Sequence, residues 1–216
     1  MRDYQFEYSI NYEGKVIDIG VMECTGNKKN RTLLIIGGLG GKIAGYNNKY
    51  VLCATSLLEY VNVISINTPR PFKEYNHLKV GIDAVRKNFP SSDEIYIWGH
   101  SAGAYYALRN SSCEDYTEIK RLLLTNMPIT VFIYDKIMGN LEAANNCAHL
   151  ERIEFIYSEF DESYDYREKL IEAGYEKVKV YTAWGQDHDF SFSLRQFINL
   201  PRKYMLHDVI GAVDEE

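Results

Sequence analysis

The sequence predicts an α/β fold with a mostly parallel central sheet of about eight strands, helices on both faces and an N-terminal antiparallel hairpin. Two observations predict this fold. Short, continuously apolar runs recur along the 216-residue chain, and segments with helical periodicity lie between them. Runs that are apolar throughout are typical of parallel strands that helices cover on both faces of the sheet.

The predicted elements follow one another in two groups. Tyr4–Asn11 and Lys15–Cys24 alternate apolar and polar residues on either side of Tyr12-Glu13-Gly14, which is typical of an antiparallel hairpin. Helical spacing of apolar residues is clear in His77–Phe89 and Tyr166–Ala173. The remaining predicted strands are short and rich in β-branched or aromatic residues: Thr32–Ile36, Val61–Ile66, Glu94–Trp98, Arg121–Thr125, Arg152–Tyr157 and Lys177–Ala183.

Composition argues against several classes of function. The net charge of −6 and the absence of a basic stripe argue against a nucleic-acid partner. No apolar stretch approaches the roughly 18 residues of a membrane span, and the N-terminus lacks the apolar region of a signal peptide. The four cysteines are scattered without a C-x-x-C pair, which favours reduced thiols and a cytoplasmic location. No repeat or linker divides the chain, so we expect one domain over residues 1–216.

The most informative motif is Gly99-His100-Ser101-Ala102-Gly103, which follows a predicted strand and precedes a stretch able to form a helix. In this context G-x-S-x-G is typical of a nucleophile elbow, a sharp turn that exposes the serine hydroxyl. Its glycines are needed because strand and helix pass close to the turn. An ordinary Gly-Ser turn between a strand and a helix is the alternative. We expect Ser101 to be a nucleophile and the side chain of His100 to point away from it.

A glycine-rich loop, Gly37-Gly38-Leu39-Gly40-Gly41-Lys42, follows another predicted strand. A P-loop would need glycine at position 36 and Ser or Thr at position 43, where the chain has Ile36 and Ile43. A dinucleotide-binding fingerprint would also need glycine at position 43. The third interpretation is an oxyanion hole, in which backbone N–H groups face the negative charge that develops during acyl transfer.

The expected donors of this oxyanion hole are the backbone N–H groups of Leu39 and of Ala102, the residue after the candidate nucleophile. Gly38 and Gly40 lie next to Leu39 and are expected to contact the substrate. Two side chains near the serine, His100 and Tyr105, are also expected to line the substrate site.

Polar residues follow the last two predicted strands, where catalytic groups of such sheets gather. Asp161 is the expected acid; Glu159, Glu162 and Asp165 are alternatives, and Asp161 could instead cap the next helix. His188 is the best-placed general base of the five histidines. Asp187-His188-Asp189 might suggest a metal site, but it has no spaced His or Cys partners, so we expect neither a metal nor a cofactor.

The chain order Ser101, Asp161, His188, with a glycine loop upstream, resembles the arrangement of the α/β-hydrolase superfamily from Tyr4 to His207. The resemblance implies that Ser101 is the nucleophile, Asp161 the acid and His188 the base. Only about 27 residues separate Arg121–Thr125 from Arg152, most of them needed for a return helix, so we expect a minimal lid or none and a comparatively open site.

The expected function is hydrolysis of a carboxylic ester through an acyl-enzyme on Ser101. Its substrate would be a small molecule or an acyl group on a carrier. A thioesterase, an acyltransferase or a peptidase would use the same residues, and a non-catalytic binding protein could share the fold. The sequence does not indicate the oligomeric state.

Overall fold

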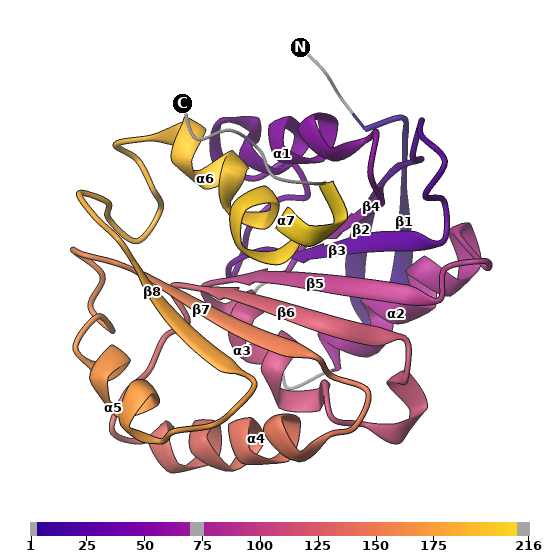
Figure 1. The fold of residues 1–216 in the computed structure, drawn as a ribbon. Helices are drawn as coiled ribbons and strands as arrows, with labels where there is room; N and C mark the ends of the chain where they lie inside the picture. The colour runs from indigo at the N-terminus through magenta and orange to yellow at the C-terminus, as the bar shows by residue number, and fades with distance from the viewer. Residues whose placement is uncertain (1–3, 70–75, 211–216) are drawn as a thin grey trace.

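A computed structural model describes residues 4–69 and 76–210 of the chain. Eight strands form one sheet in the order β1-β2-β4-β3-β5-β6-β7-β8 (Figure 1). The strands are β1 (Phe6–Tyr12), β2 (Lys15–Met22), β3 (Arg31–Ile36), β4 (Asn62–Ile66), β5 (Glu94–His100), β6 (Ile119–Thr125), β7 (Arg152–Ser158) and β8 (Val178–Ala183). Each begins and ends within two residues of the strand predicted from the sequence.

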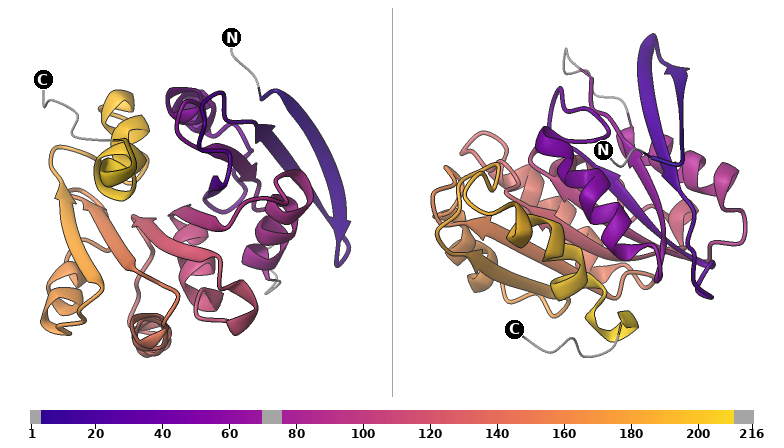
Figure 2. Two further views of the ribbon diagram at one scale, coloured as in Figure 1. Left: turned by 45° about the vertical axis from the view of Figure 1, so that its right-hand side comes forward. Right: turned by 90° about the horizontal axis from the view of Figure 1, so that it is seen from above.

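The pairing of the strands confirms a mostly parallel sheet with an antiparallel N-terminal hairpin. β1 and β2 pair antiparallel, as do β2 and β4. All other neighbouring strands, from β4 and β3 through to β8, pair parallel. Figure 2 shows the hairpin at one edge of the sheet, with β8 at the other. The carboxyl ends of the parallel strands therefore lie together at one end of the sheet.

Helices cover both faces of the sheet, as predicted. The α-helices are α1 (Lys49–Leu57), α2 (His77–Asn88), α3 (Ala102–Asn110), α4 (Tyr134–Asn146), α5 (Tyr166–Glu172), α6 (Leu194–Leu200) and α7 (His207–Ile210). Figure 1 shows α1, α6 and α7 on one face and α2, α3, α4 and α5 on the other. Three short segments complete the list: η1 (Tyr46–Asn48), η2 (Glu114–Tyr116) and η3 (Pro201–Met205).

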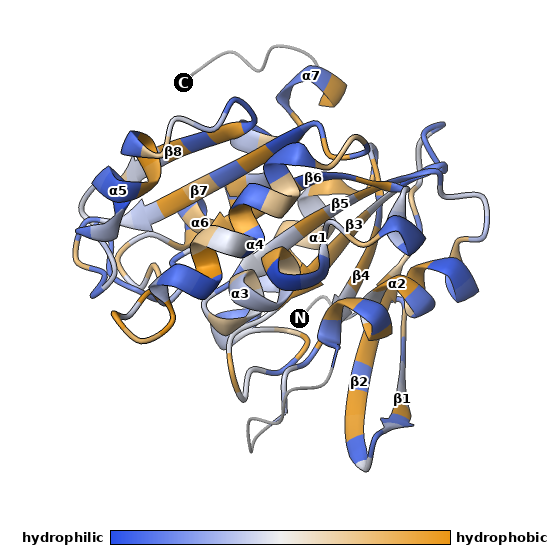
Figure 3. Ribbon diagram, turned by 90° about the horizontal axis from the view of Figure 1, so that it is seen from below, coloured by the Kyte–Doolittle hydropathy of each residue, from blue (hydrophilic) through white to orange (hydrophobic). Residues whose placement is uncertain are grey.

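Two hydrophobic cores hold these layers together, because successive side chains of a strand point to opposite faces. In β3, Leu34 and Ile36 belong to the core beneath α2 and α3, whereas Leu33 and Ile35 belong to the core beneath α1 and α6. Figure 3 shows hydrophobic residues along the central strands and mixed hydrophilic and hydrophobic residues along α2.

The connection from β6 to β7 contains α4 and two flanking loops, and no inserted lid. The expectation of a lidless α/β fold is therefore confirmed. Among the described helices, none is both long and apolar enough to cross a membrane.

Helix α3 lies unusually close to the sheet at its N-terminus. A Cβ atom added to Gly103 would lie 2.0 Å from the carbonyl oxygen of Ile36 and 2.5 Å from that of Gly37. A Cβ on Gly99 would lie 2.5 Å from the Cα of Ala104. These distances are far below van der Waals contact, so the two glycines of the motif permit the close approach of α3 to β3 and β5.

We expect Gly103→Ala to lower the free energy of unfolding by about 3 kcal/mol, because backbone atoms must move apart to admit the methyl group. Gly139→Ala in α4 is the matched control, since a Cβ there would meet nothing within 4 Å. That change should raise the free energy of unfolding by about 1 kcal/mol, the usual gain from alanine in a helix. Urea denaturation measures both. Equal effects of the two substitutions would contradict the close approach.

Candidate active site

Ser101 lies in a sharp turn between the end of β5 and the start of α3, with φ 55° and ψ −127°. Few residues other than glycine adopt a positive φ, and such a conformation costs on the order of 1–3 kcal/mol. Two hydrogen bonds hold it: the Ser101 N–H donates to the carbonyl of Thr125 (2.8 Å), and the Ala104 N–H donates to the carbonyl of Ser101 (3.0 Å). The serine is thus held in a strained backbone at the carboxyl end of the sheet.

Asp161 and His188 form a short hydrogen bond between the loops that follow β7 and β8. His188 Nδ1 lies 2.5 Å from Asp161 Oδ2, and the other carboxylate oxygen accepts the N–H of Ser163 at 2.7 Å. The carboxylate is buried, while the imidazole is half-exposed. The hydrogen bond to Asp161 raises the pKa of His188, because it favours the charged imidazole.

The alternative acids have other surroundings. Glu159 accepts the N–H of Gly185 at 2.8 Å, Glu162 is exposed, and Asp165 is the N-cap residue of α5. Asp161 does not cap α5; its second oxygen stabilises the turn before that helix. Among these four carboxylates, Asp161 is the one bonded to His188.

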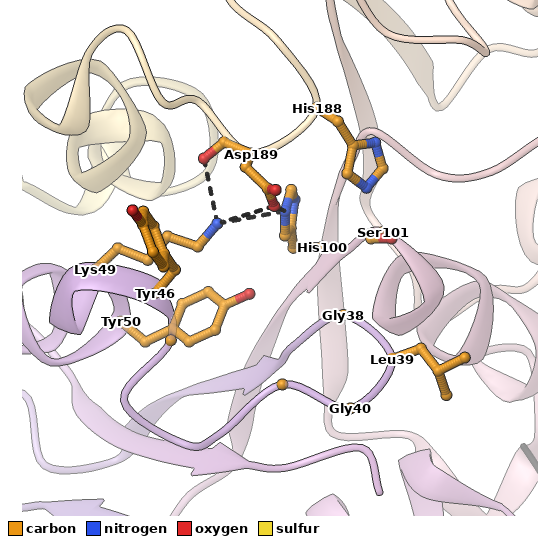
Figure 4. A pocket seen from close by; sticks show the side chains of 12 residues that line it. Gly38, Leu39, Gly40, Tyr46, Lys49, Tyr50, His100, Ser101, His188 and Asp189 are labelled. Carbon is orange, nitrogen blue, oxygen red and sulfur yellow. Dashed lines mark hydrogen bonds and ion pairs between the residues drawn. The ribbon is translucent and has the colours of Figure 1, made fainter. Parts of the chain in front are cut away.

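Ser101 and His188 line the same pocket, which has a volume of about 370 Å³. Figure 4 shows the His188 ring over Ser101, with one ring nitrogen directed toward the serine. Because Nδ1 faces Asp161, the nitrogen available to Ser101 is Nε2. The pocket is lined by Gly38, Leu39, Gly40, Gly41, Gly45, Tyr46, Lys49, Tyr50, His100, Ser101, His188 and Asp189.

The glycine-rich loop forms one wall of this pocket. Gly38 lies so close to Ser101 that an added Cβ would be 3.3 Å from the serine Cβ. The N–H of Gly40 donates to the carbonyl of Thr68 (2.6 Å), and the N–H of Gly41 donates to the carbonyl of Gly38 (2.9 Å). These two amides stabilise the loop itself, so they are not available to an anion in the pocket.

The two expected oxyanion donors come from the glycine-rich loop and from the residue after the serine. Leu39 lines the pocket, and Ala102 is the first residue of α3. The first N–H groups of a helix have no acceptor within the helix, and they carry the positive end of its dipole. The position of Ala102 is therefore compatible with the predicted role.

His100 lines the pocket, as expected from the sequence. It is the last residue of β5 and shares a face of that strand with Trp98, so its ring packs at 5.4 Å on Phe197 of α6 and lines the pocket. The ring centroids of His100 and His188 are 5.5 Å apart. Burial lowers the pKa of His100 to about 4, so this imidazole is neutral at pH 7.

Tyr105 does not line the pocket with the other expected substrate-binding residues. It lies in α3, is buried in the core between that helix and the sheet, and contacts the ring of Tyr106 at 6.0 Å. One helical turn separates it from the serine, and its side chain packs into the core.

Lys49, which the sequence analysis missed, contributes a buried ammonium group to the pocket. It is the first residue of α1 and shares a buried stripe with Cys53 and Leu57, at i+4 and i+8. Its Nζ lies 3.3 Å from the carbonyl oxygen of Asp189 and 3.5 Å from His100 Nε2. A lysine on the apolar stripe of a helix is the signal that could have identified it.

Asn126 is a second residue that the sequence analysis missed. It is fully buried after β6, with a positive φ of 46°. Its Nδ2 donates to the carbonyl of His188 (2.7 Å) and to Ser158 Oγ (2.8 Å), and its Oδ1 accepts the N–H of Ser158 (2.8 Å). Asn126 thereby joins the histidine loop to the end of β7.

Three potential metal ligands meet in the pocket. Ligand atoms of His100, His188 and Asp189 all lie within 4.8 Å of one another. The ammonium of Lys49, 3.5 Å from His100 Nε2, would repel a cation there.

Solved structures of other proteins are similar to this one over nearly its whole length. No protein-family model matches the sequence, and no curated protein matches it. The structure is similar to Est1E from Butyrivibrio proteoclasticus (TM-score 0.69, 13% identity, covering 95% of this chain and 99% of that one). It is also similar to an α/β serine hydrolase homologue from Coxiella burnetii, with a TM-score of 0.70 and 16% identity, covering 93% of this chain and 97% of that one. A third similar structure is XC6422 from Xanthomonas campestris, described as an α/β serine hydrolase without a lid. Its TM-score is 0.66 and its identity 16%, and the match covers 94% of each chain.

We expect Asn126→Ala to lower the free energy of unfolding by about 3 kcal/mol, because buried partners lose their hydrogen bonds and alanine is disfavoured at positive φ. Asn27→Ala, at an exposed loop position, is the control and should change it by less than about 0.5 kcal/mol. Urea denaturation measures both variants. Similar small effects would show that the buried network adds nothing to stability.

Proposed function

We propose that this chain, which has the α/β-hydrolase fold, is a serine hydrolase that cleaves a carboxylic ester through an acyl-enzyme on Ser101. One observation carries the proposal: a serine in a strained turn shares a pocket with an imidazole whose far nitrogen is bonded to a buried carboxylate. A base oriented by a third group and placed beside a hydroxyl is the arrangement that activates a serine.

In the first half-reaction, Ser101 Oγ attacks the carbonyl carbon of the ester while His188 Nε2 takes the hydroxyl proton. Asp161 stabilises the imidazolium that forms, which agrees with the raised pKa of His188. The imidazolium then protonates the leaving alcohol as its bond to the acyl carbon breaks. In the second half-reaction water attacks the acyl-enzyme, His188 takes its proton, and the acid leaves as Ser101 regains a hydrogen.

The N–H groups of Leu39 and Ala102 stabilise the oxyanion of the tetrahedral intermediate. The position of Ala102 at the N-terminus of α3 supports this role, because the helix dipole favours negative charge there. The absence of a side chain at Gly38 leaves room for the substrate carbonyl beside Ser101.

The lidless β6–β7 connection supports small or carrier-linked acyl substrates rather than long buried chains. Est1E, one of the similar structures, has been solved with ferulic acid bound. A pocket of about 370 Å³ has room for an ester of a compact organic acid. Thioesters and amides would be cleaved by the same residues. Measuring kcat/KM for matched esters, thioesters and amides therefore ranks the three substrate classes.

We expect a fluorophosphonate probe to label wild-type protein and to leave Ser101→Ala unlabelled. Hydrolysis of 4-nitrophenyl butyrate by that variant should fall by at least about 10⁴-fold in kcat, because no other group can form the acyl-enzyme. Ser9→Ala, in β1 of the N-terminal hairpin, is the control and should retain labelling and turnover. Folded wild-type protein that stays unlabelled, or equal turnover by wild type and Ser101→Ala, would refute the proposed function.

The pH profile of kcat/KM tests the histidine. His188 acts as a base only when neutral, and its pKa is raised, so activity should fall as pH drops through a value above 6.5. Asp161→Asn removes the charged partner, so the acidic limb should move to lower pH and kcat should fall about 10⁴-fold. Glu162→Gln, at an exposed position beside it, should leave the profile in place. If the acidic limb of the pH profile stays in place in Asp161→Asn, the assignment of Asp161 as the partner of His188 is contradicted.

A further inference from the structure

The pocket of Ser101 contains a cation for which the proposed mechanism has no use. The side chain of Lys49 is 5% exposed, and its ammonium group lies in the pocket against His100 (Figure 4). Burying a charge is costly unless it is well paired, so a buried ammonium beside a reactive serine calls for a partner.

The ammonium makes only long contacts within the described part of the chain. Its Nζ lies 3.3 Å from the carbonyl oxygen of Asp189, 3.5 Å from His100 Nε2 and 3.9 Å from Asp189 Oδ1. Hydrogen bonds between an ammonium and a carboxylate are normally 2.7–2.9 Å long. Below the ammonium lies the ring of Phe197, 4.2 Å away. Its charge is therefore only partly compensated.

The nearest carboxylate does not neutralise it fully. The side chain of Asp189 is 65% exposed at the rim of the pocket, whereas the ammonium is buried. Consistent with this, burial lowers the pKa of Lys49 to about 8, although Asp189 acts in the opposite direction. An anionic group entering the pocket would complete the coordination of the ammonium and displace water from it.

We propose that Lys49 is an anion-binding subsite and that the ester cleaved by the proposed hydrolase carries a carboxylate. This inference rests on the proposed function. A carboxylate fits better than a phosphate, because Lys49 is the only lysine or arginine among the described pocket residues and the carboxylate of Asp189 is close. A phosphate dianion would meet one positive and one negative charge and no bidentate arginine.

The carboxylate could belong to the acyl part or to the alcohol part of the ester. In the view of Figure 4, His100 lies between the ammonium and Ser101, so the carboxylate must be separated from the scissile carbonyl by a spacer. Half-esters of dicarboxylic acids represent the first case, and hydroxybenzoates acylated on the hydroxyl group represent the second.

The test compares anionic esters with neutral ones. One arm uses 4-nitrophenyl monoesters of glutarate, adipate and pimelate against the corresponding 4-nitrophenyl methyl diesters. The other uses 4-acetoxybenzoate against its methyl ester. In at least one arm, wild type should favour the anionic ester by ten-fold or more in kcat/KM, because only the anionic ester can form a charge-assisted hydrogen bond with the ammonium.

The variant Lys49→Met keeps an unbranched chain on the ring of Phe197 but removes the charge. It should lower the anionic-to-neutral ratio of kcat/KM by at least ten-fold, and Lys49→Arg should retain part of the preference. Lys87→Met is the matched control. Lys87 is in α2, outside the pocket, and its ammonium lies 4.5 Å from the centroid of the Tyr8 ring. Its ratio should equal that of wild type.

A measurement on wild type alone does not depend on the folding of a variant. The titratable groups around the ammonium are Tyr46, Tyr50, His100, Asp187, His188 and Asp189. Burial keeps His100 neutral and Tyr50 protonated, while hydrogen bonding keeps Asp187 and Asp189 ionised against the effect of burial. The titration of His188 affects both esters and cancels in the ratio. The preference should therefore fall several-fold from pH 7 to pH 9, as Lys49 loses its proton.

The outcomes separate this inference from the proposed function. One set of outcomes refutes the subsite and leaves the proposed function standing. In it, Ser101 reacts with fluorophosphonate and neutral esters are cleaved, but either wild type shows no preference for the anionic ester in both arms or Lys49→Met keeps that preference. If Ser101 is inert, the proposed function fails, and calorimetric titration with adipate and benzoate tests the subsite by itself. Binding that weakens ten-fold or more in Lys49→Met supports it, and equal or absent binding refutes it.

Discussion

The close contact between the N-terminus of α3 and the ends of β3 and β5 is the constraint on which the site depends. Gly99 and Gly103 allow backbone to approach backbone at distances that any side chain would prevent. This contact forces the chain through the strained turn at Ser101 and sets the serine beside Gly38. The same contact places Ala102 at the N-terminus of α3, directly after the serine, so the nucleophile and one expected oxyanion donor share a single structural cause.

The other groups reach the serine because parallel strands end at the same edge of a sheet. Asp161 follows β7, His188 follows β8, and their hydrogen bond spans the two loops. Asn126, which follows β6, bonds to the backbone of the histidine loop and to Ser158, the last residue of β7. Three consecutive strand ends are thus tied by buried hydrogen bonds, which limits how far the imidazole can move from the serine.

The electrostatics of the pocket divide it into two parts. Around His188, the buried carboxylate of Asp161 favours the charged imidazole. Around Lys49, burial favours the neutral amine, and the ring of His100 stays uncharged. The proposed chemistry uses the first part to move protons, and the inferred subsite uses the second to recognise a substrate charge.

Local pattern was enough to predict the eight strands within two residues and to bring Ser101, Asp161 and His188 into one neighbourhood, because apolar runs and strand-end positions are properties of neighbouring residues. The same reasoning failed for Tyr105, which packs into the core instead of lining the pocket. Lys49 and Asn126 were missed because their partners lie at least 30 residues away in the sequence. The residue pattern alone predicts the sheet, the elbow and the chain order of the site. Which side chains line the pocket is a result of long-range packing, because it depends on how α1 and α6 pack over the carboxyl ends of the strands.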